Sequence, residues 1–214
     1  MGRLSGPRLG RPPASTAGDT RQRIIGVAAE LFSDLGYGVT TNKDVAVAAG
    51  ISTGALYYYF ASKLDMYVAV FRELQARVDV RMRQVMETET TFGGRLRGIL
   101  DAAHELNVED PSIARFQGTA RVDRERYPDL RKAIPNPPGE GAGLMGRLIG
   151  DGIETREIDP DRRREAEAVV RVMFVGLVAS VSSDPEVHRL AIDGLKALLD
   201  GHLIRGPGPA PRPG

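Results

Sequence analysis

Apolar residues recur at helical spacing along most of this chain. In segments such as 24–35 and 64–82, successive apolar positions lie three or four residues apart, which places them on one face of a helix. The spacing predicts a first helix over about 19–36, a second over about 41–49 and a third over about 53–60. Either Thr40 or Thr41 is suited to cap the second helix, and either Ser52 or Thr53 the third. No stretch alternates as a strand does, so we expect an all-α fold.

Longer helices follow, separated by proline and glycine. Ser62 is placed to cap a helix over 63–88, and further helices are expected at about 92–107, 111–126, 138–155, 161–183 and 185–204. Residues 1–18 and 206–214 are rich in Gly and Pro without periodicity, which is typical of disorder. The chain is therefore expected to comprise a disordered basic arm (1–18), a head (19–62), a helical body (63–205) and a disordered tail (206–214).

The two short helices have the proportions of a helix-turn-helix. Gly50 supplies the turn, and the second of them opens with small and hydroxyl side chains before three consecutive tyrosines. In such a motif the start of the second helix enters the major groove, where hydroxyl and phenol groups can meet phosphates and base edges. A helix N-terminus such as that at Thr41 also favours a phosphate. The predicted DNA contacts are Thr41, Lys43, Ser52, Thr53, Gly54, Tyr57, Tyr58, Tyr59 and Lys63.

Residues 20–64 resemble the DNA-binding domain of the TetR family of transcriptional regulators. The resemblance is carried by Ala28-Ala29-Glu30-Leu31-Phe32, Gly36-Tyr37, Thr40-Thr41, Val45-Ala46 and the run Ala49-Gly50-Ile51-Ser52-Thr53-Gly54-Ala55-Leu56-Tyr57-Tyr58-Tyr59-Phe60. Tyr59 stands where the family often has His. The resemblance implies an all-α homodimer with an N-terminal three-helix helix-turn-helix domain and a C-terminal helical ligand-binding and dimerisation domain. It further implies a repressor that reads a pseudo-palindromic operator in double-stranded DNA and is released by a small ligand.

The last two predicted helices carry more apolar residues than one packing face needs. Such a surplus usually marks an interface, and the resemblance assigns dimerisation to these helices. The candidates are Val170, Phe174, Leu177, Val178, Val181, Leu190, Leu195, Leu198 and Leu199. A helix lying on a membrane surface is the alternative, but the basic flank that such a helix needs is lacking.

A ligand cavity is implied among the middle helices, and Met and Phe suit an adaptable, largely apolar one. The candidates are Phe71, Met82, Met86, His104, Phe116, Met145 and Phe174. Ordinary core packing is the alternative for each, and His104 is alternatively an exposed or already paired histidine.

Composition narrows the possible functions. The chain of 214 residues contains no cysteine, which excludes thiolate chemistry, and His188 and His202 are too isolated in sequence for a metal site. We expect no metal and no cofactor. Neither a signal peptide nor a membrane span is apparent, so a cytoplasmic protein is expected. A helical enzyme or carrier using the central cavity, and a regulator that needs no ligand, are the alternative functions.

Charge adds a weaker indication. Residues 1–63 hold 7 Lys and Arg against 4 Asp and Glu, or +3, and the remainder holds 22 against 24, or −2. A basic end on a nearly neutral body fits a local contact with a polyanion. The arm carries Arg3, Arg8 and Arg11, which would either lie in a minor groove or only add salt-dependent affinity.

Overall fold

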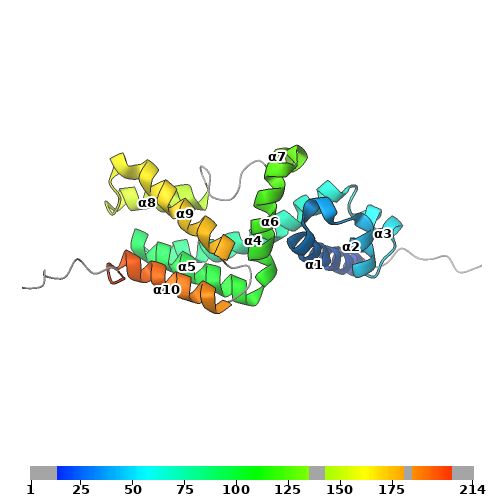
Figure 1. Cartoon of the computed structure of the whole chain (residues 1–214), viewed down its shortest axis with the longest axis horizontal. Helices are drawn as coiled ribbons and strands as arrows, with labels where there is room; N and C mark the ends of the chain where they lie inside the picture. Colours follow the sequence, from blue (N-terminus) through cyan, green and yellow to red (C-terminus); the bar gives the residue numbers. More distant parts are fainter. Residues whose placement is uncertain (1–13, 135–142, 181–184, 204–214) are drawn as a thin grey trace, which may run out of the picture.

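The computed structural model describes residues 14–134, 143–180 and 185–203. Every regular element among them is helical, which confirms the all-α prediction. Three helices form a head at one end of the molecule: α1 (Ala14–Val39), α2 (Asn42–Ala48) and α3 (Thr53–Tyr59). The head is followed by the long α4 (Lys63–Thr88), which leads into the body (Figure 1).

Caps and a turn residue position the short helices of the head as the sequence predicts. Thr41 caps α2 in a capping box, in which its hydroxyl accepts from the Asp44 amide and the Asp44 carboxylate accepts from the Thr41 amide. Ser52 caps α3 by accepting from the Ala55 amide at 3.1 Å. Gly50 has φ +65°, a left-handed conformation that glycine adopts without strain.

The first helix differs from the prediction at its start. It begins at Ala14, so residues 14–18 are helical rather than part of a disordered arm, and the rest of the arm (1–13) lies outside the described residues. Gly36 was expected to end the helix, and this is confirmed: with φ +78° and ψ 170° it is not helical, so the helix that begins at Ala14 stops there. The range of α1 extends to Val39 because a second, short helical segment follows this kink.

The body consists of the remaining helices. They are α5 (Phe92–Glu109), α6 (Pro111–Arg126), α7 (Pro128–Ala133), α8 (Leu144–Glu154), a 3-10 turn (Pro160–Arg162), α9 (Arg163–Ser180) and α10 (Pro185–Leu199). The short α7 was not expected from the sequence, and the last helix ends five residues earlier than predicted. Predicted tail 206–214 lies outside the described residues. Helix α6 stands between the head and helices α5, α8, α9 and α10, and α10 lies beside α5 (Figure 1).

One apolar core connects the head to the body. It extends from Ile24, Phe32 and Leu56 in the head to Phe116 and Leu148 in the body, all of which are almost completely buried. A second, smaller cluster of Leu100, Leu177 and Ile192 joins α5, α9 and α10. In the part of the chain that the structure describes, no helix is both long enough and apolar enough to cross a membrane.

Candidate nucleic-acid interface

The candidate recognition surface is the outward face of α3. Leu56 and Phe60 are buried and fix the helix against the head core, while the start of the helix at Ser52, Thr53 and Gly54 is exposed. Because helical geometry sends neighbouring positions in different directions, anchoring two apolar side chains presents the polar ones to solvent.

The three tyrosines are not equivalent. Tyr58 is 71% exposed and Tyr57 is 52% exposed, whereas Tyr59 is half-buried against the core. The rings of Tyr58 and Tyr59 meet edge to face, with centroids 5.3 Å apart. Two exposed phenols on one short helix are therefore available to a partner, and the third supports them.

Tyr57 is held by a neighbour on α2. The Asn42 side-chain amide donates to the Tyr57 hydroxyl at 3.2 Å. This bond uses the phenol oxygen as an acceptor, so the phenol proton stays free to be donated outward, for example to a phosphate oxygen. The arrangement also reduces the number of orientations that the ring can adopt before binding. Asn42 was not among the residues predicted from the sequence.

The N-terminus of α2 adds polar groups beside α3. Thr41 and Lys43 are both exposed, and the Thr41 hydroxyl donates to the Asp44 carboxylate at 2.7 Å. The hydrogen bond from Thr41 lowers the pKa of Asp44, with a smaller contribution from the charge of Lys43. A phosphate at this helix end would meet free amides and Lys43, with the negative charge of Asp44 nearby.

Lys63 is placed differently from the other predicted contacts. Its ammonium group donates to the carbonyl oxygens of Tyr37 at 2.6 Å and Thr40 at 2.9 Å, and it lies 4.4 Å from the centre of the Tyr37 ring. Burial lowers the pKa of Lys63, opposed by the charge of Asp123. Its three donors are thus largely engaged within the protein, which leaves little for a phosphate.

The predicted dimer residues divide into two groups. Val170 and Leu177 are buried inside the subunit, which corrects their assignment to the surface, and Leu195 packs partly buried against the second cluster. Leu190, Leu198 and Leu199 are exposed, Phe174 and Val178 are half-buried, and Val181 lies outside the described residues.

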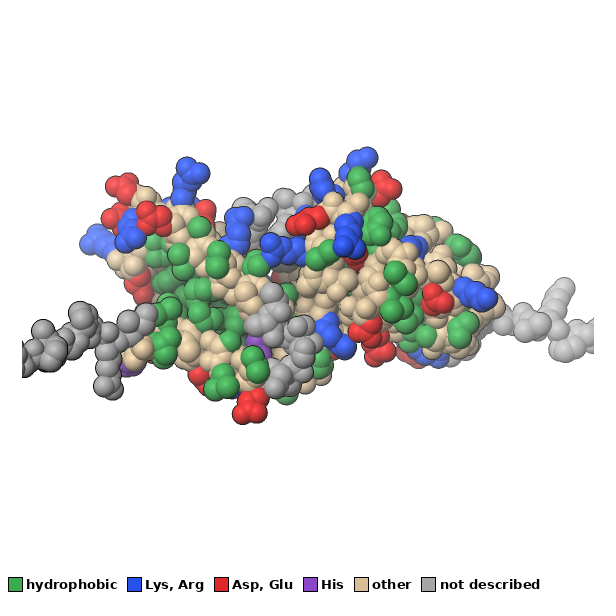
Figure 2. Space-filling model, in the orientation of Figure 1, with side chains coloured by type: hydrophobic (Ala, Val, Ile, Leu, Met, Phe, Trp, Pro, Cys, Tyr) green, Lys and Arg blue, Asp and Glu red, His purple; other side chains and the backbone are tan. Residues whose placement is uncertain are grey.

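Exposed valines missed by the prediction extend this surface. Val169, Val172 and Val175 follow the outer side of α9, and Val187 lies on α10. Figure 2 shows hydrophobic side chains gathered over the region of α9 and α10. We call this surface, comprising the exposed apolar residues of α9 and α10, the α9–α10 face.

Six of the seven predicted ligand residues belong to the main apolar core. Met82 and Phe116 are almost fully buried in it, and the others pack against it partly buried: Phe71, Met86, Met145 and Phe174. The seventh, His104, lies apart from this group, against α10. A ligand among these residues would require some of the side chains to move apart.

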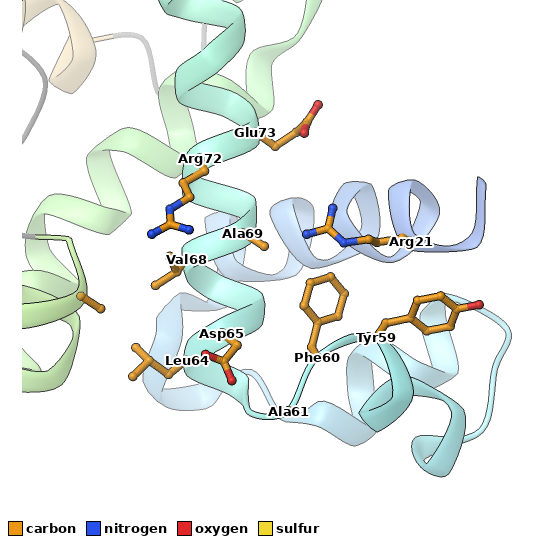
Figure 3. A pocket seen from close by; sticks show the side chains of 11 residues that line it. Arg21, Tyr59, Phe60, Ala61, Leu64, Asp65, Val68, Ala69, Arg72 and Glu73 are labelled. Carbon is orange, nitrogen blue, oxygen red and sulfur yellow. The ribbon is translucent and has the colours of Figure 1, made fainter. Parts of the chain in front are cut away.

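A surface groove of about 690 Å³ lies elsewhere, between α1, the end of α3, α4 and α7. None of the predicted ligand residues lines it. Figure 3 shows Arg21 of α1 over the ring of Phe60, with the guanidinium carbon 5.2 Å from the ring centre. The walls combine Leu64 and Val68 with charges of both signs, including Asp65 and Arg72.

The structure pairs two histidines that are 84 positions apart. The Nδ1 atoms of His104 on α5 and His188 on α10 lie 3.2 Å apart, and His188 is almost completely buried. Burial lowers the pKa of His188, and the neighbouring His104 lowers it further. Among the described residues no group of three or more His, Cys, Asp and Glu side chains is placed to hold a metal ion.

A capped helix-turn-helix with exposed phenols, joined to a helical body, defines the class of helical DNA-binding regulators. Residues 24–70 match the family model described as bacterial regulatory proteins of the TetR family. The HTH-type transcriptional regulator TtgW of Pseudomonas putida is 32% identical over 51% of this chain and 83% of its own length. The chain belongs to the TetR family of transcriptional regulators.

Two further comparisons extend the similarity over nearly the whole chain. The HTH-type transcriptional regulator UidR of Escherichia coli is 25% identical over 86% of this chain and 93% of its own. The fold is also similar to that of the transcriptional regulator FadR from Bacillus subtilis, solved in complex with stearoyl-CoA. That structure has a TM-score of 0.65 and 21% identity, covering 84% of this chain and 98% of FadR.

Proposed function

We propose that this protein is a dimeric transcriptional repressor that binds operator DNA through α3 and leaves it when a small ligand binds the body. The observation that carries the proposal is the exposed tyrosine pair on α3, with Tyr57 already oriented by Asn42. In a dimer the two α3 helices would enter successive major grooves about 34 Å apart and read a pseudo-palindrome. Repression is the usual sign of regulation in the family that the chain resembles.

The proposed DNA contacts lie on α3 and at the start of α2. Hydroxyl and phenol groups would contact phosphates and base edges, Gly54 would allow close approach, and Lys43 would add a charge-assisted contact to phosphate. The set comprises Thr41, Lys43, Ser52, Thr53, Gly54, Tyr57, Tyr58 and Tyr59. We assign Lys63 to holding the head together, because its ammonium group already binds two carbonyl oxygens.

The α9–α10 face is the proposed dimer interface. Val172 is 70% exposed and Leu190 is 65% exposed, on neighbouring helices. Covering such residues with a second copy of the same face would remove apolar surface from water without burying an unpaired charge. Two copies related by a two-fold axis would each supply both helices.

The proposed effector is a largely apolar small molecule. The Met and Phe side chains of the core around Met82 and Phe116 can repack to admit one, because thioether chains are flexible. FadR of Bacillus subtilis was solved with stearoyl-CoA, so long-chain acyl thioesters are a rational first class to screen. A ligand releases DNA only if it binds better to the head spacing that does not fit the operator.

Selection of bound fragments from genomic DNA, followed by anisotropy measurements on the selected sequence, tests the DNA-binding proposal. We expect a pseudo-palindrome, and we expect Tyr57→Ala to weaken binding about tenfold while the thermal unfolding midpoint stays unchanged. Val80→Ala is a matched control, because Val80 is exposed on α4 and lies about 25 Å along that helix from its start. Equal affinity of Tyr57→Ala and wild type would contradict the assignment of α3.

A regulator that needs no ligand is the second candidate. The near-complete burial of Met82 and Phe116 favours it, since side chains already occupy that part of the core. Thermal-shift screening with apolar compounds, including acyl-CoA, separates the two candidates: a compound that raises the unfolding midpoint should also lower operator affinity. Either regulator would act in the bacterial cytoplasm, where the chromosome is. The relatives are regulators, so we propose no enzymatic activity.

A further inference from the structure

Helix α6 is joined to the C-terminal part of α1 by polar contacts on successive turns. The Ser33 hydroxyl donates mainly to the Ala29 carbonyl within α1 at 2.6 Å and lies 3.4 Å from the Ser112 carbonyl, and Arg115 pairs with Asp34 at 3.1 Å. One turn further along α6, the Thr119 hydroxyl donates to the Ser33 carbonyl at 3.0 Å. We call this row, which ends at Asp123, the α1–α6 seam. It connects the head directly to a body helix that is not adjacent in sequence.

Asp123 is the buried member of the α1–α6 seam. Only 5% of the residue is exposed, and its Oδ2 atom accepts two hydrogen bonds. One comes from the Tyr37 amide at 2.8 Å, and the other comes from the Tyr67 hydroxyl on α4 at 3.1 Å. A single carboxylate oxygen therefore ties together the end of α1, the start of α4 and α6. Burial together with the charge of Asp123 raises the pKa of Tyr67, so this phenol remains a donor.

Tyr37 transmits this attachment to the helix-turn-helix. Its amide is held by Asp123, its carbonyl by Lys63, and its ring lies between those of Tyr67 and Tyr127, each with its centre 5.2 Å away. The same Lys63 also holds the Thr40 carbonyl, immediately before the cap of α2. Only three residues lie between Tyr37 and Thr41, so fixing Tyr37 limits the directions that α2 and α3 can take.

We propose that Asp123 is a positioning residue that sets the orientation of the DNA-reading head relative to the body. The proposal rests on the proposed function, because it concerns how two heads are spaced on one operator. Charge-assisted hydrogen bonds inside a low-dielectric core hold geometry more firmly than exposed ones. A head fixed in this way matches one separation of half-sites and resists others, because the network must distort to reach them.

Weakening the hydrogen bonds that Asp123 accepts should change how operator affinity depends on the spacing of the half-sites. A freer head loses more conformational freedom when it binds the best operator, so affinity for that operator falls. The same freedom lets the head reach operators whose half-sites are one base pair further apart or closer together. The affinity that is lost on changing the spacing therefore becomes smaller. Operator affinity then depends less on half-site spacing. A change that only unfolds part of the protein would instead lower the affinity for every operator by the same factor.

The experiment measures operator affinity across a spacing series with full-length dimeric protein. The operator comes from genomic selection with wild type, and its two half-sites are moved apart or together by one base pair. Asp123→Asn keeps the size of the side chain but removes the charge, and we expect the ratio of best to altered spacing to fall about tenfold. Asp129→Asn is the control, since Asp129 is an exposed carboxylate on α7 whose charge also acts on Tyr37.

A second variant keeps the test decisive if Asp123→Asn does not fold. Tyr67→Phe removes the hydroxyl that donates to Asp123. We expect the ratio of best to altered spacing to fall here too, but by less than in Asp123→Asn. Wild-type spacing ratios in the folded variants would overturn the positioning role of Asp123, even with affinity reduced overall. Failure of the wild type to select any operator would instead overturn the proposed function, so the two failures are distinguishable.

Discussion

The outward faces of α3 and of the α9–α10 pair are both exposed, but they differ in chemistry. On α3 the exposed large side chains are the phenols of Tyr57 and Tyr58, flanked by hydroxyl groups, and Asn42 fixes Tyr57. On α9 and α10 they are Val and Leu, including Val172 and Leu190. Such side chains contribute to the free energy of association only by being removed from water. Exposed aromatic groups with polar ends suit DNA, and exposed aliphatic groups suit another protein surface.

The two surfaces also differ in how they are supported. The head is held by hydrogen bonds and caps around Tyr37. The α9–α10 pair is held by apolar packing through Leu177 and Ile192, and α10 is also tied to α5 by ion pairs of Asp101 with Arg189 and Lys196. The hydrogen bonds around Tyr37 fix the orientation of the reader, whereas those of α10 leave its outer apolar residues free for a partner. The following predictions test this difference.

The largest effect is expected at the α9–α10 face. Val172→Asp combined with Leu190→Asp would place charges in the dimer interface, where desolvation is unfavourable. We expect sedimentation to show monomers and operator affinity to fall more than about a hundredfold, because each half-site would bind alone. Val80→Asp, an exposed valine on α4, should leave the dimer intact. If the double variant remained a dimer, the proposal that this face is the dimer interface would be contradicted.

Two glycines of α1 distinguish the anchored part of the head from its free part. A Cβ on Gly38 would clash with the Tyr127 hydroxyl, so Gly38→Ala should reduce the free energy of unfolding by about 1–3 kcal/mol. A Cβ on Gly26 would meet nothing within 4 Å, so Gly26→Ala should raise that free energy by about 0.5–1 kcal/mol. Chemical denaturation measures both, and equal effects would mean that the Tyr127 contact imposes no constraint.

A moderate effect is expected from loosening Tyr57 without removing it. Asn42→Ala deletes the amide that holds the phenol, so Tyr57 must be ordered during binding instead of before it. Operator affinity should fall about threefold, less than for Tyr57→Ala, and the protein should remain folded. If Asn42→Ala weakened binding as much as Tyr57→Ala, Asn42 would itself be a DNA contact.

The smallest effect concerns pH and the α5–α10 contact. Burial, assisted by His104, lowers the pKa of His188 below its ordinary value of 6.5. The unfolded chain therefore takes up a proton at a pH where the folded chain stays neutral, and the free energy of unfolding should decrease as the pH falls below about 6.5. His188→Phe should weaken this dependence in denaturation curves, whereas His202→Gln, an exposed histidine, should preserve it.

Local features could be predicted where neighbouring residues decide the structure. Helix caps act over a few residues, as Thr41 does with Asp44 and Ser52 with Ala55, and Pro111 likewise marks the start of α6. The caps and the first turn of α6 are therefore visible in the sequence. Helix α7 escaped prediction because six residues between prolines show no periodicity. The break of α1 at Gly36 could also be predicted, because glycine adopts a left-handed conformation without strain.

Features that depend on packing partners could not be predicted in the same way. Asp123 lies among arginines in the sequence, a pattern typical of a solvated face. It becomes a buried acceptor only because Tyr37 and Tyr67 pack against it in the folded chain. The apolar pattern of α9 is so broad that its inner and outer residues cannot be separated from sequence. Val170 consequently appeared as an interface residue although it faces the core, while the neighbouring Val172 was missed.

The contact between His104 and His188 has a consequence for the ring tautomers. When both rings are neutral, one Nδ1 must carry the proton that the other Nδ1 accepts, so the accepting ring must carry its own proton on Nε2. The two histidines therefore occupy different tautomers. Their ring nitrogens should consequently give two distinct sets of nitrogen-15 resonances, which would report directly on whether α10 is seated against α5.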